Sequence, residues 1–150
     1  MDNNLYKNFL STGFKQANEK NAQHQVDMYQ YNLAEHLPKD RAAKILEIGS
    51  GMGRFLEFLG TRGYDDFLGV DLSEEAVRYC QDKGIEKVKL ITDLDEFLVS
   101  SVQYDAIVMN DVIEHIPKQE VVQVLTKLHE KLKVGGKLIV KTGNMSSIIG

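Results

Sequence analysis

The chain has 150 residues, 43% of them hydrophobic and 27% charged, and its formal net charge at pH 7 is −4. This length and composition predict one folded domain and exclude a disordered or low-complexity chain. The negative net charge argues against a protein that binds nucleic acid through a basic face, so we expect no nucleic-acid partner.

The first 43 residues predict a helical cap ahead of the main fold. Residues 1–10 lack the basic and then apolar pattern of a signal peptide. Apolar side chains share a helical face over residues 5–14, and again over residues 19–37, until Pro38 ends the pattern. The second helix is expected to cover one face of a sheet. Polar groups of this region are candidates for closing over a ligand: Tyr6, Lys20, Gln23 and His24.

The strongest local signal lies in residues 44–53, KILEIGSGMG. A short apolar strand there breaks into a turn with three glycines, and apolar residues at helical spacing follow from Arg54. Strand, glycine turn and helix form the opening of a nucleotide-binding βαβ unit. Glycine has no Cβ, so a ligand can lie directly against the backbone, and the start of the helix offers unpaired N–H groups.

Four more strands are predicted downstream, with helical segments between them. The strands are expected at residues 67–70, 87–91, 104–109 and 137–141. The third of the five strands alternates lysine with apolar residues, so it should lie at an edge of the sheet. The last helix is expected to begin at Pro117, to include Leu132 in its apolar face, and to end at Gly135-Gly136.

Cys80 is the only cysteine of the chain. It falls in the apolar stripe of the helix that begins after Ser73, which favours a buried core residue over a reactive thiol. A single cysteine excludes an internal disulfide and fits the reducing cytoplasm, where we expect the protein. No apolar run approaches the length that spans a bilayer, so we expect no membrane association.

The alternation of strands and helices predicts a doubly wound α/β fold, with a mainly parallel sheet of about five strands and helices on both faces. Ligands bind such sheets beyond the carboxyl ends of the strands, where the strand order reverses. The residues that should meet there are Glu47, Gly49, Asp71, Asp93 and Asn110.

We therefore expect the ligand site at this edge, with Asp93 at the end of the third strand.

Two details separate the glycine loop from a dinucleotide-binding loop. Asp71 lies 22 positions after Gly49, where a carboxylate can accept hydrogen bonds from both ribose hydroxyls of NAD or of another nucleotide. However, Arg54 stands where the dinucleotide fingerprint needs its third glycine, and Glu47 places an acid where a pyrophosphate would have to pass. An acid there suits a ligand with positive charge, so an NAD-dependent oxidoreductase is the less favoured alternative.

Five motifs in this order resemble the class I S-adenosylmethionine-dependent methyltransferases: ILEIGSGMGRFLEFL, GVDLSEEAV, ITDLDEF, YDAIVMNDVIEHIP and GGKLIV. The resemblance implies a Rossmann-like cofactor-binding core at residues 44–150, behind a helical cap at residues 1–43. It also implies S-adenosyl-L-methionine as cofactor, S-adenosyl-L-homocysteine as product, and transfer of a methyl group to an acceptor oxygen, nitrogen or carbon.

The resemblance assigns the methionine part of the cofactor to the first strand and its loop. The cofactor-binding loop residues would be Gly49, Ser50, Gly51 and Gly53. Glu47 would brace this loop and favour the amino group and the sulfonium of the cofactor.

The remaining cofactor contacts implied by the resemblance come from the next three strand ends. Asp71 would hold the ribose hydroxyls, and Leu72 would flank the adenine. Asp93 would meet the adenine amino group, with Leu94 on the ring. Asn110 would face the methionine moiety.

A hydroxyl acceptor would also need a general base. Candidates after Asn110 are Asp111, Glu114 and His115. We assign the catalytic role to His115, although a histidine just before a proline more often makes a structural hydrogen bond. Glu114 and His115 are also potential metal ligands, but no second His/Cys cluster supports them, so we expect no metal.

The resemblance implies two further antiparallel strands after the fifth, and the chain stops at Gly150. We therefore expect a truncated domain whose fifth strand is an exposed edge that can pair with a second copy in a homodimer. Residues 143–150 resemble a segment of methyltransferases that modify sugars, so we expect a small-molecule or glycan acceptor. The alternative function is a module that binds the cofactor without turnover.

Overall fold

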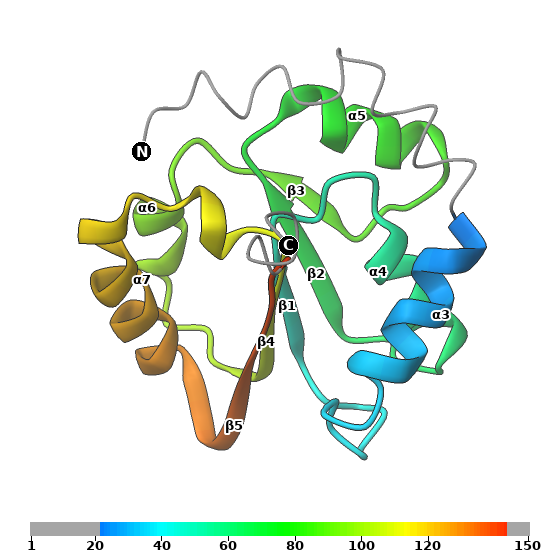
Figure 1. The fold of residues 1–150 in the computed structure, drawn as a ribbon, viewed down its shortest axis with the longest axis horizontal. Coiled ribbons are helices and arrows are strands. Elements are labelled where there is room, and N and C mark those ends of the chain that lie inside the picture. Colours follow the sequence, from blue (N-terminus) through cyan, green and yellow to red (C-terminus); the bar gives the residue numbers. More distant parts are fainter. Residues whose placement is uncertain (1–21, 144–150) are drawn as a thin grey trace, which may run out of the picture.

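Five parallel strands form the centre of the fold in the computed structural model, which describes residues 22–143 (Figure 1). The strands are β1 Ile45–Ile48, β2 Phe67–Asp71, β3 Val88–Leu90, β4 Tyr104–Asn110 and β5 Leu132–Lys141. Their order is β3-β2-β1-β4-β5, so the direction of winding reverses between β1 and β4. The doubly wound α/β fold expected from the sequence is confirmed.

Helices cover both faces of this sheet. They are α3 Ala22–Asn32, α4 Arg54–Thr61, α5 Glu74–Asp82, α6 Leu94–Leu98, the 3-10 turn η2 Ile113–His115 and α7 Lys118–Glu130. In Figure 1, α3 and α4 lie on one side of the sheet, and α6 and α7 lie on the other. Over residues 22–143, no helix combines the length and the apolarity needed to cross a membrane.

The two faces of β1 are buried under different helices. Side chains alternate along a strand, so Leu46 and Ile48 pack in the cluster beneath α6 and α7, whereas Ile45 packs in the cluster beneath α3 and α4. Glu47 is two residues after Ile45, so its side chain lies on the same face of β1. It is also buried, with 2% of its surface exposed. The strand therefore carries one acid on its α3–α4 face.

The second predicted helix is shorter than expected in the described residues. It ends at Asn32, whose side-chain Nδ2 donates a hydrogen bond to the carbonyl oxygen of Met28 at 2.9 Å. Leu33 and Leu37 follow in a turn and are still buried against β1 and α4, which explains why their spacing resembled a helical face. The helix expected at residues 5–14 lies outside the described residues.

The fifth strand begins earlier than predicted. Leu132 was expected in the helix but belongs to β5, where it pairs with Tyr104. Residues 137–141 pair with β4 as expected, after a register shift that contains Gly135 at φ +80°. A Cβ on Gly136 would lie 2.9 Å from the carbonyl oxygen of Lys133. The two glycines therefore make an irregularity inside the strand rather than a stop to the helix.

The third strand lies at the edge of the sheet, as its lysines predicted. Val88 is buried and Lys89 is exposed, but Leu90 is also 41% exposed. The expected alternation therefore fails at the end of β3, where Leu90 borders an open pocket.

Candidate functional site

The carboxyl ends of β1, β2 and β4 meet where the winding of the sheet reverses. Ile48 at the end of β1 is in register with Val70 of β2 and with Met109 of β4. The next residue on each neighbouring strand is polar: Asp71 on β2 and Asn110 on β4. The structure therefore brings these two residues to the same edge as Glu47 and the glycine loop, as the sequence predicted.

The glycine loop needs glycine for two different reasons. Gly49, Gly51 and Gly53 all have positive φ, at 75°, 51° and 76°. A Cβ on Gly49 would lie 2.5 Å from Cγ2 of Val112, and one on Gly53 would lie 2.9 Å from Sγ of Cys80. A Cβ on Gly51 would meet nothing within 4 Å. The first and third glycines therefore pack against the protein, and the middle one borders open space.

Glu47 forms a buried polar pair with Asn110. Nδ2 of Asn110 donates a hydrogen bond to Oε1 of Glu47 at 3.1 Å. The other oxygen of each side chain, Oε2 of Glu47 and Oδ1 of Asn110, has no hydrogen-bond partner among the described residues, and neither does Oγ of Ser50 in the glycine loop. Buried polar atoms in native proteins are nearly always satisfied, so this group of atoms indicates a site for a polar ligand.

Burial raises the pKa of Glu47 to about 8, because a charged carboxylate loses its hydration there. The hydrogen bond from Asn110 lowers this pKa, and the negative charge of Asp71 raises it further. A positively charged ligand group beside Oε2 would supply the counter-charge that this environment lacks.

Asp71 connects the glycine loop to the start of α5. Its Oδ2 accepts a hydrogen bond from the backbone N–H of Gly51, and its Oδ1 accepts one from the N–H of Ser73, both at 2.8 Å. Burial raises the pKa of this carboxyl group, and the backbone hydrogen bonds lower it. Each carboxylate oxygen has a second lone pair, so Asp71 can hold the loop and still accept from a ligand hydroxyl.

The chain turns sharply where β4 ends. Asp111 is the one non-glycine residue with positive φ, at 53°, within residues 22–143. Its backbone N–H donates to the carbonyl oxygen of Lys141 at 2.8 Å, and its carboxylate pairs with Nζ of the same lysine. This turn places Val112 directly against Gly49, so it helps to fix the position of the glycine loop.

His115 lies beyond this turn, on η2, and its side chain is exposed. Its backbone N–H donates to the carbonyl oxygen of Val112 at 2.9 Å. Glu114, the neighbouring candidate, is also exposed. The structure thus places both residues after the end of β4, outside the buried group that contains Glu47. Within residues 22–143, no cluster of three or more His, Cys, Asp or Glu side chains is arranged to hold a metal ion.

The residues expected around the adenine separate into two groups. Oδ1 of Asp93 accepts from the N–H of Glu96 at 3.0 Å and so caps α6. Leu94 is buried in the core with Ile91. Leu72, by contrast, is only half-buried and borders a pocket. Leu72 therefore faces open space, whereas Asp93 and Leu94 already have structural contacts.

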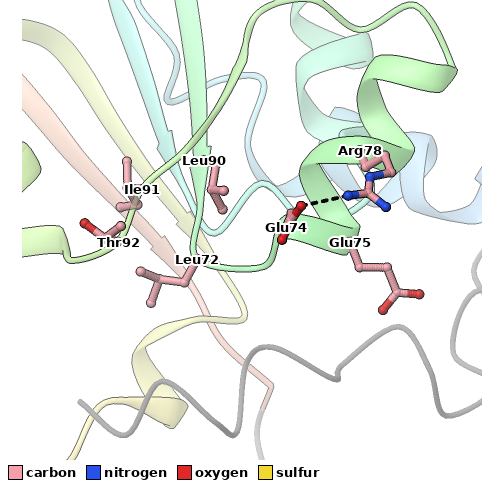
Figure 2. Close-up of a pocket in the computed structure, with 7 residues that line it drawn as sticks. All are labelled: Leu72, Glu74, Glu75, Arg78, Leu90, Ile91 and Thr92. Carbon is pink, nitrogen blue, oxygen red and sulfur yellow. Dashed lines mark hydrogen bonds and ion pairs between the residues drawn. The ribbon is translucent and has the colours of Figure 1, made fainter.

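The pocket beside Leu72 has a volume of about 530 Å³ and lies between α5 and the end of β3 (Figure 2). Its lining consists of Leu72, Glu74, Glu75, Arg78, Leu90, Ile91 and Thr92. Nη2 of Arg78 binds Oε1 of Glu74 at 2.7 Å on one wall. The opposite wall is mainly apolar, which suits a flat, weakly polar group.

Two residues near the site were missed by the sequence analysis. Tyr29 of α3 packs edge-on against Phe55, with ring centroids 5.2 Å apart. Burial raises the pKa of the Tyr29 hydroxyl, and the negative charges of Glu47 and Asp111 raise it further. Tyr29 therefore interacts electrostatically with both acids. Arg54 begins α4, and its buried Nε has no partner among the described residues.

The spacing of apolar residues in the sequence does not indicate that Tyr29 and Arg54 lie near the site. Helical spacing placed Tyr29 on the buried face of its helix, but spacing does not show which way a hydroxyl points.

Four polar residues were candidates for closing over a ligand. Gln23 and His24 are exposed on α3, whereas Tyr6 and Lys20 lie outside the described residues.

A family model described as a methyltransferase domain matches residues 19–147. Among curated proteins, cyclosporin synthetase of Tolypocladium inflatum is 30% identical over 99 residues, which are 58% of this chain and 1% of that protein. Chondramide synthase of Chondromyces crocatus is 34% identical over 116 residues, which are 72% of this chain and 3% of that protein. The chain therefore spans a very small part of the curated relatives it matches.

Solved structures share the fold. A SAM-dependent methyltransferase from Archaeoglobus fulgidus superimposes with a TM-score of 0.74 at 22% identity, covering 91% of this chain and 62% of that one. Magnesium protoporphyrin IX methyltransferase from Synechocystis PCC 6803, solved with bound SAM, gives a TM-score of 0.66 at 19% identity and covers 99% and 83%. The Rossmann-like architecture implied by the sequence motifs is thus confirmed.

Proposed function

The chain belongs to the methyltransferase domain family, and from this premise we propose that it binds S-adenosyl-L-methionine and transfers the methyl group to a small-molecule acceptor. The observation that carries this proposal is the buried pair of Glu47 and Asn110 next to the glycine loop, whose Oε2 and Oδ1 have no partner among the described residues. This group lies at the carboxyl ends of the strands, where doubly wound sheets bind their ligands.

The charge of the site favours this cofactor over a dinucleotide. S-Adenosylmethionine carries an ammonium and a sulfonium group, and both favour a carboxylate such as Glu47. NAD would bring a negatively charged pyrophosphate close to the same acid, and Asp71 adds a second negative charge nearby. An NAD-dependent oxidoreductase is therefore the weaker reading of this site.

The other parts of the cofactor have matching surroundings in the proposal. The methionine part would lie along the open side of Gly51, and the ribose hydroxyls would donate to Asp71. The adenine would enter the mainly apolar pocket beside Leu72, with Asp93 near its amino group and Leu94 behind it. These assignments follow the sequence motifs and are supported by the open space at Gly51 and Leu72.

When bound, the cofactor supplies an activated methyl group, so the protein mainly has to position the two reactants. Asn110 would orient the methionine part, and the left-handed turn at Asp111 would hold Val112 against the loop. For a hydroxyl acceptor, His115 is our proposed general base, since it follows β4 at the same edge of the sheet.

A small-molecule acceptor is favoured because both curated relatives are named for the synthesis of a particular compound, cyclosporin in one case and chondramide in the other. A saccharide acceptor is the second candidate, and it rests only on the sequence of residues 143–150. We also propose a cytoplasmic location, because the sole cysteine is free and buried.

Calorimetric titration tests the cofactor assignment. We expect S-adenosylmethionine and S-adenosylhomocysteine to bind and NAD not to bind. Asp71→Ala should weaken binding about tenfold to hundredfold, because charge-assisted hydrogen bonds are lost. The matched control is Asp82→Ala, which removes an exposed acid at the end of α5.

Binding of NAD alone would contradict the assignment. Methyl transfer from labelled cofactor to a panel of hydroxyl, amine and sugar acceptors then separates an enzyme from a module that only binds the cofactor. An equal effect of Asp71→Ala and Asp82→Ala on affinity would remove Asp71 from the site.

The outer edge of β5 is our proposed homodimer contact. No other strand of the described sheet pairs with that edge, and Val134 and Val140 are exposed on it. Unpaired edge strands are templates for pairing with another chain. We expect light scattering at high protein concentration to give twice the monomer mass, and Val140→Lys, which places a charge at an exposed position of β5, to restore the monomer. A monomer at every concentration would contradict this contact.

A further inference from the structure

Glu47 is an acid without a counter-ion in the described structure. It is 2% exposed, and its one hydrogen bond within residues 22–143 is the one that Asn110 donates to Oε1. Oε2 has no partner there. A buried carboxylate is strongly destabilised unless it is paired, and such groups usually become neutral instead.

The charged and titratable groups around Glu47 do not supply the missing positive charge. Tyr29 of α3, Asp71 of β2 and Cys80 of α5 interact electrostatically with Glu47, and none of them is a cation. Asp111 after β4 acts on Tyr29, Glu57 of α4 acts on Cys80, and Arg54 of α4 acts on both. Arg54, the cation among these groups, is paired through Nη1 with Glu57 at 3.2 Å.

A neutral Glu47 also fits the hydrogen-bonding groups beside it. A protonated carboxyl group has an O–H to donate. Oδ1 of Asn110 is an acceptor without a partner, and it belongs to the same amide group that already contacts Glu47. An acid and an amide can satisfy each other in this way only while the acid keeps its proton.

We propose that Glu47 is a neutral acid in the cofactor-free protein and releases its proton to solvent when the ammonium group of S-adenosylmethionine binds beside it. The inference rests on the proposed function. In this step the O–H bond of Glu47 breaks, the proton passes to the buffer, and the carboxylate that remains pairs with the ammonium. Burial raises the pKa of Glu47 to about 8, which is consistent with a proton held at neutral pH.

The step predicts a measurable proton count and a pH-dependent affinity. Because binding requires loss of a proton, affinity should rise by up to about tenfold per pH unit below the pKa of Glu47. Free α-amino groups titrate at about pH 7.7–8.0. At about pH 6.5 the cofactor ammonium is therefore protonated both free and bound, and any proton released comes from the protein.

The experiment is calorimetric titration of the full chain with S-adenosylmethionine at that pH, in buffers with different ionisation enthalpies. We expect the observed enthalpy to vary linearly with the buffer enthalpy, with a slope that corresponds to release of close to one proton. Adenosine, which lacks the amino-acid part, should bind without releasing a proton. Glu47→Gln should bind S-adenosylmethionine more weakly and with no dependence on buffer or pH.

Binding of S-adenosylmethionine with the same enthalpy in every buffer would overturn the inference and leave the proposed function intact. Failure of S-adenosylmethionine to bind in any buffer would overturn both. If Glu47→Gln does not fold, the comparison of S-adenosylmethionine with adenosine on the unaltered chain still decides, because equal proton release with both ligands would contradict the role of Glu47.

Discussion

At the scale of single residues, the glycine loop separates packing from ligand access. Gly49 and Gly53 border side chains of the protein, whereas the space beside Gly51 is open. All three have positive φ, so an alanine at any of them carries a backbone cost of roughly 1–2 kcal/mol. The position of the missing Cβ, rather than the backbone angle, therefore distinguishes their roles.

Gly51→Ala should leave the fold intact and weaken binding of S-adenosylmethionine by about tenfold or more, since the new methyl group would occupy the proposed ligand space. Gly63→Ala is the matched control, because Gly63 also has positive φ, at 85°, and open space around it, but lies in the turn after α4. Thermal melts and calorimetric titrations measure both effects. Equal loss of affinity in the two variants would contradict the assignment of the space at Gly51.

The site residues could be predicted in part because strand ends are visible in a sequence. Glu47, Asp71 and Asn110 follow or end apolar strands, and parallel strands bring such residues to one edge. The pairing of Glu47 with Asn110 could not be predicted, since it depends on side-chain direction across two strands that lie 63 residues apart. The approach of Tyr29 depends in the same way on how α3 packs against α4.

At the scale of elements, local signals located helices and strands better than they located their ends. Leu132 continues the apolar spacing of α7 and also fits a strand, so its sequence does not decide between the two. Pairing with Tyr104 of β4 decides it in the structure. The end of α3 likewise depends on tertiary contacts, because Leu33 and Leu37 are buried whether or not the helix continues.

The start of α5 gives a test at this scale. Oγ of Ser73 accepts a hydrogen bond from the N–H of Ala76 at 3.2 Å and caps the helix. Ser73→Ala should lower the free energy of unfolding by about 1 kcal/mol, the usual value of such a cap. Urea denaturation measures the change, and Ser101→Ala, at an exposed position outside the helices, is the control. Equal midpoints for the two variants would show that the cap contributes nothing.

At the scale of the whole molecule, the site and the sheet have opposite requirements. The sheet is stabilised by apolar residues buried on both faces, as on β1 and β4. The site places an acid, an amide and a hydroxyl among these residues, and each of the three has a side-chain oxygen without a partner within residues 22–143. The ligand-free protein should therefore be less stable than its fold allows, and a ligand that satisfies these groups should raise its melting temperature.

The pH dependence of stability in the ligand-free protein tests this cost directly. The pKa of Glu47 is raised from 4.5 to about 8 on folding, so the native state binds this proton more tightly than the unfolded chain does. The stabilisation is complete below the unfolded pKa and is lost as pH rises toward 8, at a rate of at most about 1.4 kcal/mol per pH unit. Asp105, whose pKa is lowered chiefly by its hydrogen bond with Lys133, changes the free energy of unfolding in the opposite direction and only in more acidic solution.

Urea denaturation between about pH 5.5 and 7.5 should therefore show a free energy of unfolding that falls as pH rises in the unaltered chain. Glu47→Gln, which cannot titrate, should show a much flatter profile, and parallel profiles would mean that Glu47 is ionised throughout this range.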